Sequence, residues 1–253
     1  MTSEEGLREK RIKELAEKCS DALNTIELFY REPYVNYSMK IRGIPYTECV
    51  AGFVLQHLDS FKRIPMITRE KSYDSKHTGL YDPNSPRIEE LDAMKMFNQC
   101  RNNPDPTIGD AGHVIDYQVP LKNKRSDNAG KIDLLTETDD TVYVLELKKE
   151  ESKETLLRCV LEGYTYLKTV NKEKLFRDYG INPHKPLKTA PLIYENSRPG
   201  EEYLDMINGN RPKLNELMRK LDVAPFLLTR KDNTFYSKQC KMCEEFHLFV
   251  RFE

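Results

Sequence analysis

The sequence predicts an α/β fold, in which a central mixed sheet is flanked by helices and preceded by an N-terminal helical extension. Beyond residue 86 the predicted elements follow the order helix, three strands, helix, strand, helix and strands, which is typical of one mixed sheet. Leu, Ile, Val and Phe together exceed the roughly one-fifth of residues below which chains tend to stay disordered. We therefore expect one compact domain, with residues 1–82 as the extension and residues 83–253 as the core.

The extension is predicted to be mainly helical. Apolar residues recur at helical spacing among charges over residues 7–30. Residues 50–61 are predicted as a short helix and residues 64–73 as a strand. The turn-forming segment 79–86 (GLYDPNSP) marks the boundary with the core.

The core has sharper signals. Ser85 can cap a helix that carries Pro86 at its first position and ends near residue 100. Residues 114–121 (VIDYQVPL) alternate as a strand does, with one face formed by Ile115, Tyr117, Val119 and Leu121. The other predicted elements are strands at 131–136 and 141–148, a helix at 152–170, a strand at 192–194, a helix at 213–221 and strands at 225–229 and 246–252.

Charge and composition restrict the class of protein. The 40 basic and 41 acidic residues give a net charge of −1, which argues against a uniformly polycationic nucleic-acid binder. No apolar run reaches the ~18 residues that a membrane helix needs, and the charged start MTSEEGLREK does not look like a secretory signal. We therefore expect a cytoplasmic protein without membrane contact, whose six cysteines are reduced thiols.

The segment 130–149 (GKIDLLTETDDTVYVLELKK) carries the candidate chemistry. If Asp139 and Asp140 form the centre of an antiparallel hairpin, Asp133 and Glu146 lie opposite each other, with Cβ atoms about 4.5–5.5 Å apart. Lys148 follows Glu146 by two residues and shares its face. The opposite face is predicted to be apolar, because it gathers Ile132, Leu134, Tyr143, Leu145 and Leu147.

Two carboxylates this close repel each other and need compensating positive charge. Lys148 supplies one charge, and Mg²⁺ or Mn²⁺ with oxygen ligands would supply more. Such a cation can polarise a phosphodiester and activate water, while a neighbouring lysine stabilises the developing charge. The alternative is a surface hairpin whose charged side chains are simply solvated.

These residues resemble the core of the PD-(D/E)XK nuclease superfamily, which has the restriction-endonuclease-like fold. Its pattern is an Asp at the start of the second strand, Glu-x-Lys on the third strand, and then a helix. Here these positions are Asp133, Glu146 and Lys148, with Ile132 in place of the family's proline. The resemblance spans about residues 86–170. It implies that Asp133, Glu146 and the Leu147 carbonyl bind Mg²⁺ or Mn²⁺, and that Lys148 positions or activates water.

Two helices add candidates. RecB-type members of the superfamily carry Gln-x-x-x-Tyr on the helix that follows, and this chain has Glu162 and Tyr166 at that spacing. Glutamate cannot donate a hydrogen bond to a nucleic acid, so only Tyr166 is kept as a contact, and a capped surface turn beside the core residue Tyr164 is the equal alternative. The superfamily often adds an acidic residue on the preceding helix, where Glu90 is favoured over Glu89 because it lies nearer the edge of the apolar stripe. Acidic residues are also common at a helix N-terminus, which is the alternative for both.

Basic side chains near the proposed site would contact phosphates, although a solvated basic loop is an equal alternative. With Tyr166, the candidate nucleic-acid-binding residues are Lys122, Lys124, Arg125, Lys131, Lys149 and Arg158. Cys240 and Cys243 have metal-ligand spacing, but a closed four-cysteine site is poorly supported.

The sequence thus predicts a metal-dependent nuclease that hydrolyses phosphodiester bonds. DNA is the expected substrate by resemblance alone, and the extension could narrow access to the site or mediate a homodimer. The alternatives are a catalytically silent module of the same fold that binds nucleic acid or assembles with partners, and a hydrolase acting on another substrate.

Overall fold

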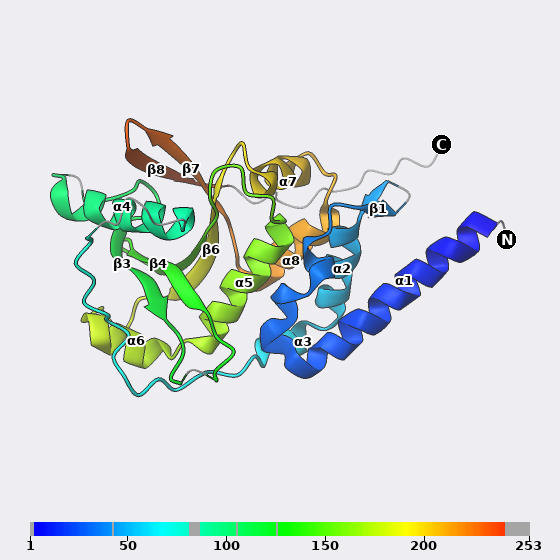
Figure 1. Cartoon of the computed structure of the whole chain (residues 1–253), viewed down its shortest axis with the longest axis horizontal. Coiled ribbons are helices and arrows are strands. Elements are labelled where there is room, and N and C mark those ends of the chain that lie inside the picture. Colours follow the sequence, from blue (N-terminus) through cyan, green and yellow to red (C-terminus); the bar gives the residue numbers. More distant parts are fainter. Residues whose placement is uncertain (1–2, 42, 81–86, 105, 125, 241–253) are drawn as a thin grey trace.

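The structure is a computed structural model that describes residues 3–41, 43–80, 87–104, 106–124 and 126–240 (Figure 1). Within these ranges a six-stranded mixed sheet has the order β3-β4-β5-β6-β7-β8. The β3-β4, β4-β5 and β7-β8 pairs are antiparallel, whereas β5-β6 and β6-β7 are parallel. The strands span His113–Pro120 (β3), Lys131–Glu137 (β4), Val142–Leu147 (β5), Leu187–Tyr194 (β6), Phe226–Lys231 (β7) and Thr234–Gln239 (β8).

Helices cover both faces of this sheet. On one face α4 packs on a core that includes Leu134, Leu145 and Leu192, and on the other α5 packs on Leu135, Val144 and Ile193. The predicted α/β architecture with a mixed sheet between helices is therefore confirmed. The helices of this region are α4 (Ile88–Asn102), α5 (Leu156–Thr169), α6 (Lys172–Tyr179), α7 (Arg198–Ile207) and α8 (Pro212–Leu221).

The N-terminal region is mainly helical, as predicted, and its buried residues belong to the core that α5 covers. Phe29, Val50 and Phe61 are buried in the same cluster as Val160 of α5 and Leu217 of α8. In Figure 1, α1 begins at the end of the molecule remote from the sheet. The elements are α1 (Ser3–Ala22), two short 3₁₀ helices η1 (Leu23–Arg31) and η2 (Pro33–Asn36), a small hairpin β1 (Lys40–Ile41) and β2 (Ile44–Pro45), α2 (Tyr46–Gln56) and α3 (Leu58–Lys62).

The hairpin of β4 and β5 has the predicted register. The paired residues run from Leu134 opposite Leu145 to Glu137 opposite Val142, in the register that a turn centred on Asp139 and Asp140 requires. Strand β3 departs from the predicted alternation. Its register shifts between Val114 and Asp116, and Tyr117 packs in the core beneath α4, apart from Val119 and Leu121.

Several expectations were wrong. Residues 64–73 form no strand, because their backbone bonds to helices instead, with Ile67 N donating to the Thr169 carbonyl at 2.9 Å. The helix predicted from residue 152 begins at Leu156, where the Thr155 side chain caps it. Helices α6 and α7 and strand β8 were not predicted. The first two carried readable signals, an Asn171 cap and a Gly180 end for α6 and a Ser197 cap for α7.

Other predictions lie outside the described residues, namely the Ser85 cap with Pro86 and the strand at 246–252. None of the helices in the described ranges is long and apolar enough to cross a membrane. Among the described residues, Cys19, Cys49, Cys100, Cys159 and Cys240 form no disulfide bond.

We expect Asp178→Asn to weaken the attachment of segment 64–79 to α6. The Asp178 carboxylate accepts from Tyr73 N at 2.9 Å and pairs with Lys174 at 3.0 Å. Burial raises the pKa of Asp178, but these two donors lower it more, so the net pKa is below its usual range. The carboxylate therefore stabilises the fold above the unfolded-state pKa of about 4, and this stabilisation is lost as the pH falls through the lower folded-state value.

At pH 7 the variant should be less stable by about 1 kcal/mol, and the gap should close in acid, where the wild-type carboxyl is also neutral. Urea unfolding between pH 2 and about pH 7 measures this. The exposed Asp140→Asn is the control. A gap that stays constant with pH would contradict the assignment.

Candidate active site

The two predicted acidic residues lie at neighbouring ends of β4 and β5. The ladder between these strands ends at Leu134 and Leu145, one residue before Asp133 and Glu146. Asp133 Oδ2 accepts instead from Leu147 N at 3.0 Å, and Asp133 Oδ1 accepts from the Gln118 side chain at 2.9 Å. The Asp133 carboxylate thus accepts the hydrogen bond from β5 that a backbone carbonyl would accept if the ladder continued. A second hydrogen bond, from Gln118 of β3, holds it on the other side.

Lys148 lies inside a cluster of three glutamates. Its Nζ is 2.6 Å from Glu146 Oε1, 2.7 Å from Glu154 Oε2 and 3.3 Å from Glu162 Oε2. Arg158 joins the cluster through Glu154, at 3.2 Å. The sequence placed Glu146 and Lys148 on the polar face of the hairpin, but they are only 3% and 5% exposed. That expectation is corrected, because α5 brings Glu162 over this end of β5.

Gly163 allows this close approach of α5 to the sheet. A Cβ at this position would lie 2.6 Å from Thr189 Oγ1 and 3.7 Å from Glu146 Cβ. The Thr189 hydroxyl is already fixed, because it donates to the Val144 carbonyl at 2.8 Å. Any larger residue would push the helix and Glu162 away from Lys148.

We therefore expect Gly163→Ala to destabilise the fold by about 1–3 kcal/mol, although alanine is the better helix former. The matched control is Gly52→Ala in α2, where a Cβ would meet only Lys213 Cγ at 4.0 Å and should be neutral or stabilising. Urea unfolding of both variants measures the difference. Equal stability of the two variants would show that α5 can move without cost.

The cluster lacks positive charge. Among the described residues, the carboxyl groups of Asp133, Glu146, Glu154 and Glu162 lie around two cationic side chains, Lys148 and Arg158. In addition, Glu146 Oε2 is buried without a hydrogen-bond partner. The Glu146 carboxyl also lies in hydrogen-bond contact with the Glu162 carboxyl, an arrangement that needs a shared proton, so Glu146 is a position at which a cation could replace a proton.

The pKa values follow from burial and from this charge balance. Burial raises the pKa of Asp133 to about 7, against the attraction of Lys148. Burial and the neighbouring Glu162 raise the pKa of Glu146 well above its usual range. Burial also raises the pKa of Glu162, but Lys148 outweighs it, so that pKa is lowered. Of Glu146 and Glu162, Glu162 is thus the ionised partner of Lys148, and Glu146 and Asp133 are the carboxyl groups that a further cation would deprotonate.

A cleft of about 450 Å³ opens beside Asp133 and contains both acidic residues of α4. Glu90, the favoured candidate, pairs with Arg87 at 3.1 Å, whereas Glu89 Oε1 accepts from Lys149 N at 3.2 Å. Glu89 is therefore bonded to the end of the strand that carries the site. The cleft is lined by Arg87, Ile88, Glu89, Glu90, Gln118, Lys131, Asp133 and Lys149.

The residues present could hold a divalent cation that takes only a few of its ligands from the protein. In the described part of the chain, no three His, Cys, Asp or Glu side chains are grouped as a metal site would need. Mg²⁺, however, is usually held by one or two carboxylates and keeps several waters. Asp133, the unpaired oxygen of Glu146 and the nearby Leu147 carbonyl are the groups that could hold it.

The predicted nucleic-acid contacts fall into two sets. The first set consists of four predicted lysines that are exposed, two of which, Lys131 and Lys149, line the cleft. Arg158 is instead partly exposed and paired with Glu154, and Tyr166 is buried and donates to Glu162. Arg125 lies outside the described residues. The exposed lysines are Lys122, Lys124, Lys131 and Lys149.

Two site residues were not predicted, Gln118 and Glu154. Gln118 bonds Asp133 and has a φ of 51°, a left-handed backbone that is uncommon outside glycine and that often occurs at functional sites. Nothing in a strand pattern signals such a residue. Glu154 precedes Arg158 by four residues, a spacing that could have indicated an ion pair.

Comparisons of this chain with protein-family models, with curated proteins and with solved structures find no significant match.

Proposed function

We propose that the protein is a metal-dependent nuclease with a restriction-endonuclease-like core, which hydrolyses phosphodiester bonds. One observation carries the proposal. Asp133 and Glu146 lie at adjoining strand ends with Lys148, in a cluster short of positive charge and with one carboxylate oxygen unpaired. A divalent cation would satisfy that oxygen and the charge together.

The order of elements supports the resemblance on which this proposal also rests. Helix α4 is followed by three antiparallel strands, β3, β4 and β5, then by α5 and by β6, which is parallel to β5. Asp133 lies near the start of the second of these strands, and Glu146 and Lys148 lie at the end of the third. These are the positions that the PD-(D/E)XK pattern requires.

The roles of the residues follow from their positions. Asp133, Glu146 and the Leu147 carbonyl would hold Mg²⁺ or Mn²⁺, which when bound polarises the phosphodiester and lowers the pKa of water. The Lys148 ammonium orients the attacking water and stabilises the developing negative charge. Gln118 keeps Asp133 in place through its 2.9 Å hydrogen bond. Glu90 lines the cleft as a candidate for holding water or the cation.

The substrate class is proposed from charge as well as resemblance. Lys131 of β4 and Lys149, just after β5, line the cleft together with the acidic residues, so a phosphate drawn there by a cation on Asp133 would also contact two ammonium groups. The proposed partner is therefore a nucleic acid, with DNA the expected one. Single- and double-stranded, linear and circular DNA, each with Mg²⁺ or Mn²⁺, would show cleavage and its mode. The Asp133→Asn variant is the negative control.

A catalytically silent binding module remains the second candidate. The absence of a group of three metal-ligating side chains from the described residues favours it. The two candidates differ in the same experiment, because a silent module would retain DNA without cleaving it. Binding without hydrolysis at every metal concentration would favour the module.

If the exposed lysines contact phosphates, Lys122→Gln with Lys124→Gln should lower DNA affinity and reduce the salt slope of binding by up to about 2. Each lysine–phosphate contact that the variant loses means that one fewer counterion is released when DNA binds. Fluorescence anisotropy at several salt concentrations measures the slope. Lys231→Gln with Lys238→Gln, two exposed lysines of β7 and β8, is the matched control. Equal slopes in both double variants would show that the loop lysines make no such contact.

A further inference from the structure

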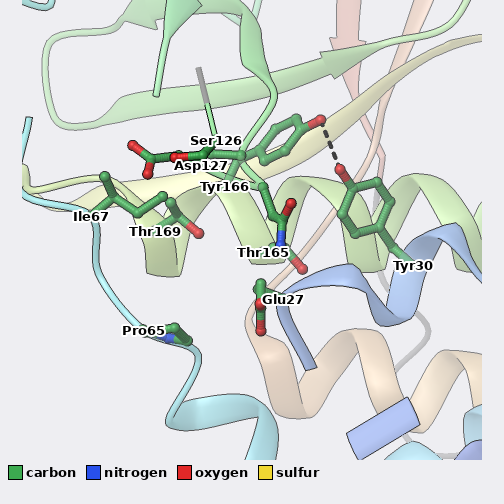
Figure 2. A pocket seen from close by; sticks show the side chains of 11 residues that line it. Glu27, Tyr30, Pro65, Ile67, Ser126, Asp127, Thr165, Tyr166 and Thr169 are labelled. Carbon is green, nitrogen blue, oxygen red and sulfur yellow. Dashed lines mark hydrogen bonds between the residues drawn. The ribbon is translucent and has the colours of Figure 1, made fainter. Parts of the chain in front are cut away.

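A chain of hydrogen bonds joins Lys148 to the N-terminal region. Glu162 Oε2 accepts from Lys148 at 3.3 Å, and its other oxygen accepts from the Tyr166 hydroxyl at 2.9 Å. The hydroxyls of Tyr166 and Tyr30 are 3.3 Å apart, and Arg31 Nε donates to Tyr30 at 2.9 Å. Figure 2 shows the two hydroxyl groups meeting between α5 and η1, beside a pocket of about 250 Å³.

The donors in this chain can all point the same way. Arg31 donates to the Tyr30 oxygen, which leaves the Tyr30 proton free to bond Tyr166. Tyr166 in turn donates its proton to Glu162. Each donation polarises the next group in the series, so the carboxylate receives a strengthened hydrogen bond at the oxygen that does not contact Lys148.

The surrounding residues leave room for this series of hydrogen bonds. A Cβ at Gly130, just before β4, would lie 2.2 Å from the Tyr166 hydroxyl, so only glycine leaves room for it. The rings of Tyr30 and Tyr166 pack edge to face, with centroids 5.9 Å apart. Both tyrosines are buried, at 1% and 6% exposure, so their hydroxyls have few alternatives to one another and to Glu162.

Of the glutamates around Lys148, Glu162 is the one that is fixed from outside the cluster. Glu154 has a side chain 29% exposed and a second partner, Arg158, that is itself partly exposed. Glu146 carries the free oxygen assigned to the cation. Glu162 has a side chain 11% exposed, and in addition to Lys148 and Arg158 it is bonded by Tyr166, which ties it to a group outside the cluster.

We propose that Glu162 is the positioning residue of Lys148, and that Tyr166 and Tyr30 make the N-terminal region part of the active site by fixing Glu162. This inference rests on the proposed nuclease function. It gives Tyr166 a structural role behind the lysine. It also gives residues 1–82 a role in the reaction, through η1.

The first test is kinetic. Glu162→Gln keeps the shape of the side chain but loses its charge, so kcat should fall about tenfold with KM nearly unchanged, because the ammonium is misplaced. Tyr166→Phe and Tyr30→Phe should lower kcat less. If the tyrosines act through Glu162, adding Tyr166→Phe to Glu162→Gln should cause no further loss. Tyr164→Phe is the matched control, since it is buried on the same helix and its hydroxyl has no hydrogen bond among the described residues.

The second test does not depend on activity. Lys148 is buried and its neighbour Lys149 is exposed, so acetic anhydride should label Lys149 first, as mass spectrometry can resolve. Glu162→Gln should raise the labelling rate of Lys148 relative to Lys149, and Tyr164→Phe should not.

An unchanged labelling ratio in Glu162→Gln, or multiplicative losses of kcat in the double variant, would overturn the positioning role. Failure of the wild-type protein to cleave any DNA would instead overturn the nuclease function. In that case the labelling ratio still decides whether Glu162 fixes Lys148.

Discussion

Lys148→Ala is expected to lower metal-dependent hydrolysis by about 10²–10³-fold, because it removes the one ammonium group placed beside both carboxylates. The same change leaves Glu146, Glu154 and Glu162 without their shared partner. Breaking a buried ion pair in this way costs about 3–5 kcal/mol. The variant is therefore expected to lose stability as well as activity.

A second variant separates catalysis from folding. Lys148→Gln combined with Glu162→Gln removes one positive and one negative charge together and leaves two amides that can bond each other. This double variant should regain most of the stability and none of the activity. Urea unfolding and DNA cleavage, measured side by side, check both statements. Lys231→Ala, an exposed lysine of β7 that does not line the cleft, is the control for activity and stability. Substantial cleavage by the folded double variant would remove Lys148 from the mechanism.

The hairpin of the site was predictable because its geometry is local. The pair Asp139–Asp140 sets a turn, and strand period then places Asp133 and Glu146 at the same end of the two strands. The four observed pairs from Leu134–Leu145 onward follow that register. Asp133, Glu146 and Lys148 could thus be named from a segment of about twenty residues, without any knowledge of the surrounding fold.

The burial of the site was not predictable, because it depends on contacts between distant segments. The approach of α5 over Lys148 requires Gly163 to lie against Thr189, and a helical glycine has no signature in a pattern of apolar spacing. In strand β3, the left-handed backbone at Gln118 brings a side chain to Asp133 that alternation does not anticipate. Sequence reasoning therefore identified the charged residues of the hairpin but did not predict that they are buried.

Burial matters because it changes how strongly the charged side chains need partners. On a solvated hairpin, Asp133 and Glu146 would need no more than water around them. Under α5, the same residues share two cations among four carboxyl groups, and one oxygen is left without a partner. The cost of that arrangement is a reason to expect a ligand that the cluster binds, since a site of this charge gains stability from a divalent cation.

Asp133→Asn is expected to weaken the binding of Mg²⁺ or Mn²⁺ at least about tenfold, as seen by titration calorimetry, because an amide oxygen carries no charge for a hard cation. The fold should change little. The asparagine oxygen can still accept from Leu147 N, and the buried carboxyl, whose pKa burial raises to about 7, is already partly neutral at that pH.

The control for this variant lies on the same hairpin. Asp139→Asn removes an exposed carboxylate from the turn between β4 and β5, far enough along the strands to leave the cluster intact. It should bind the cation as the wild-type protein does. Equal titration heats for the two variants would mean that any cation bound is held elsewhere, and Asp133 would then be a structural residue that closes the β4-β5 ladder. Loss of binding in Asp133→Asn but not in Asp139→Asn would show that the cation binds at the acidic cluster. The proposed hydrolysis depends on that metal site.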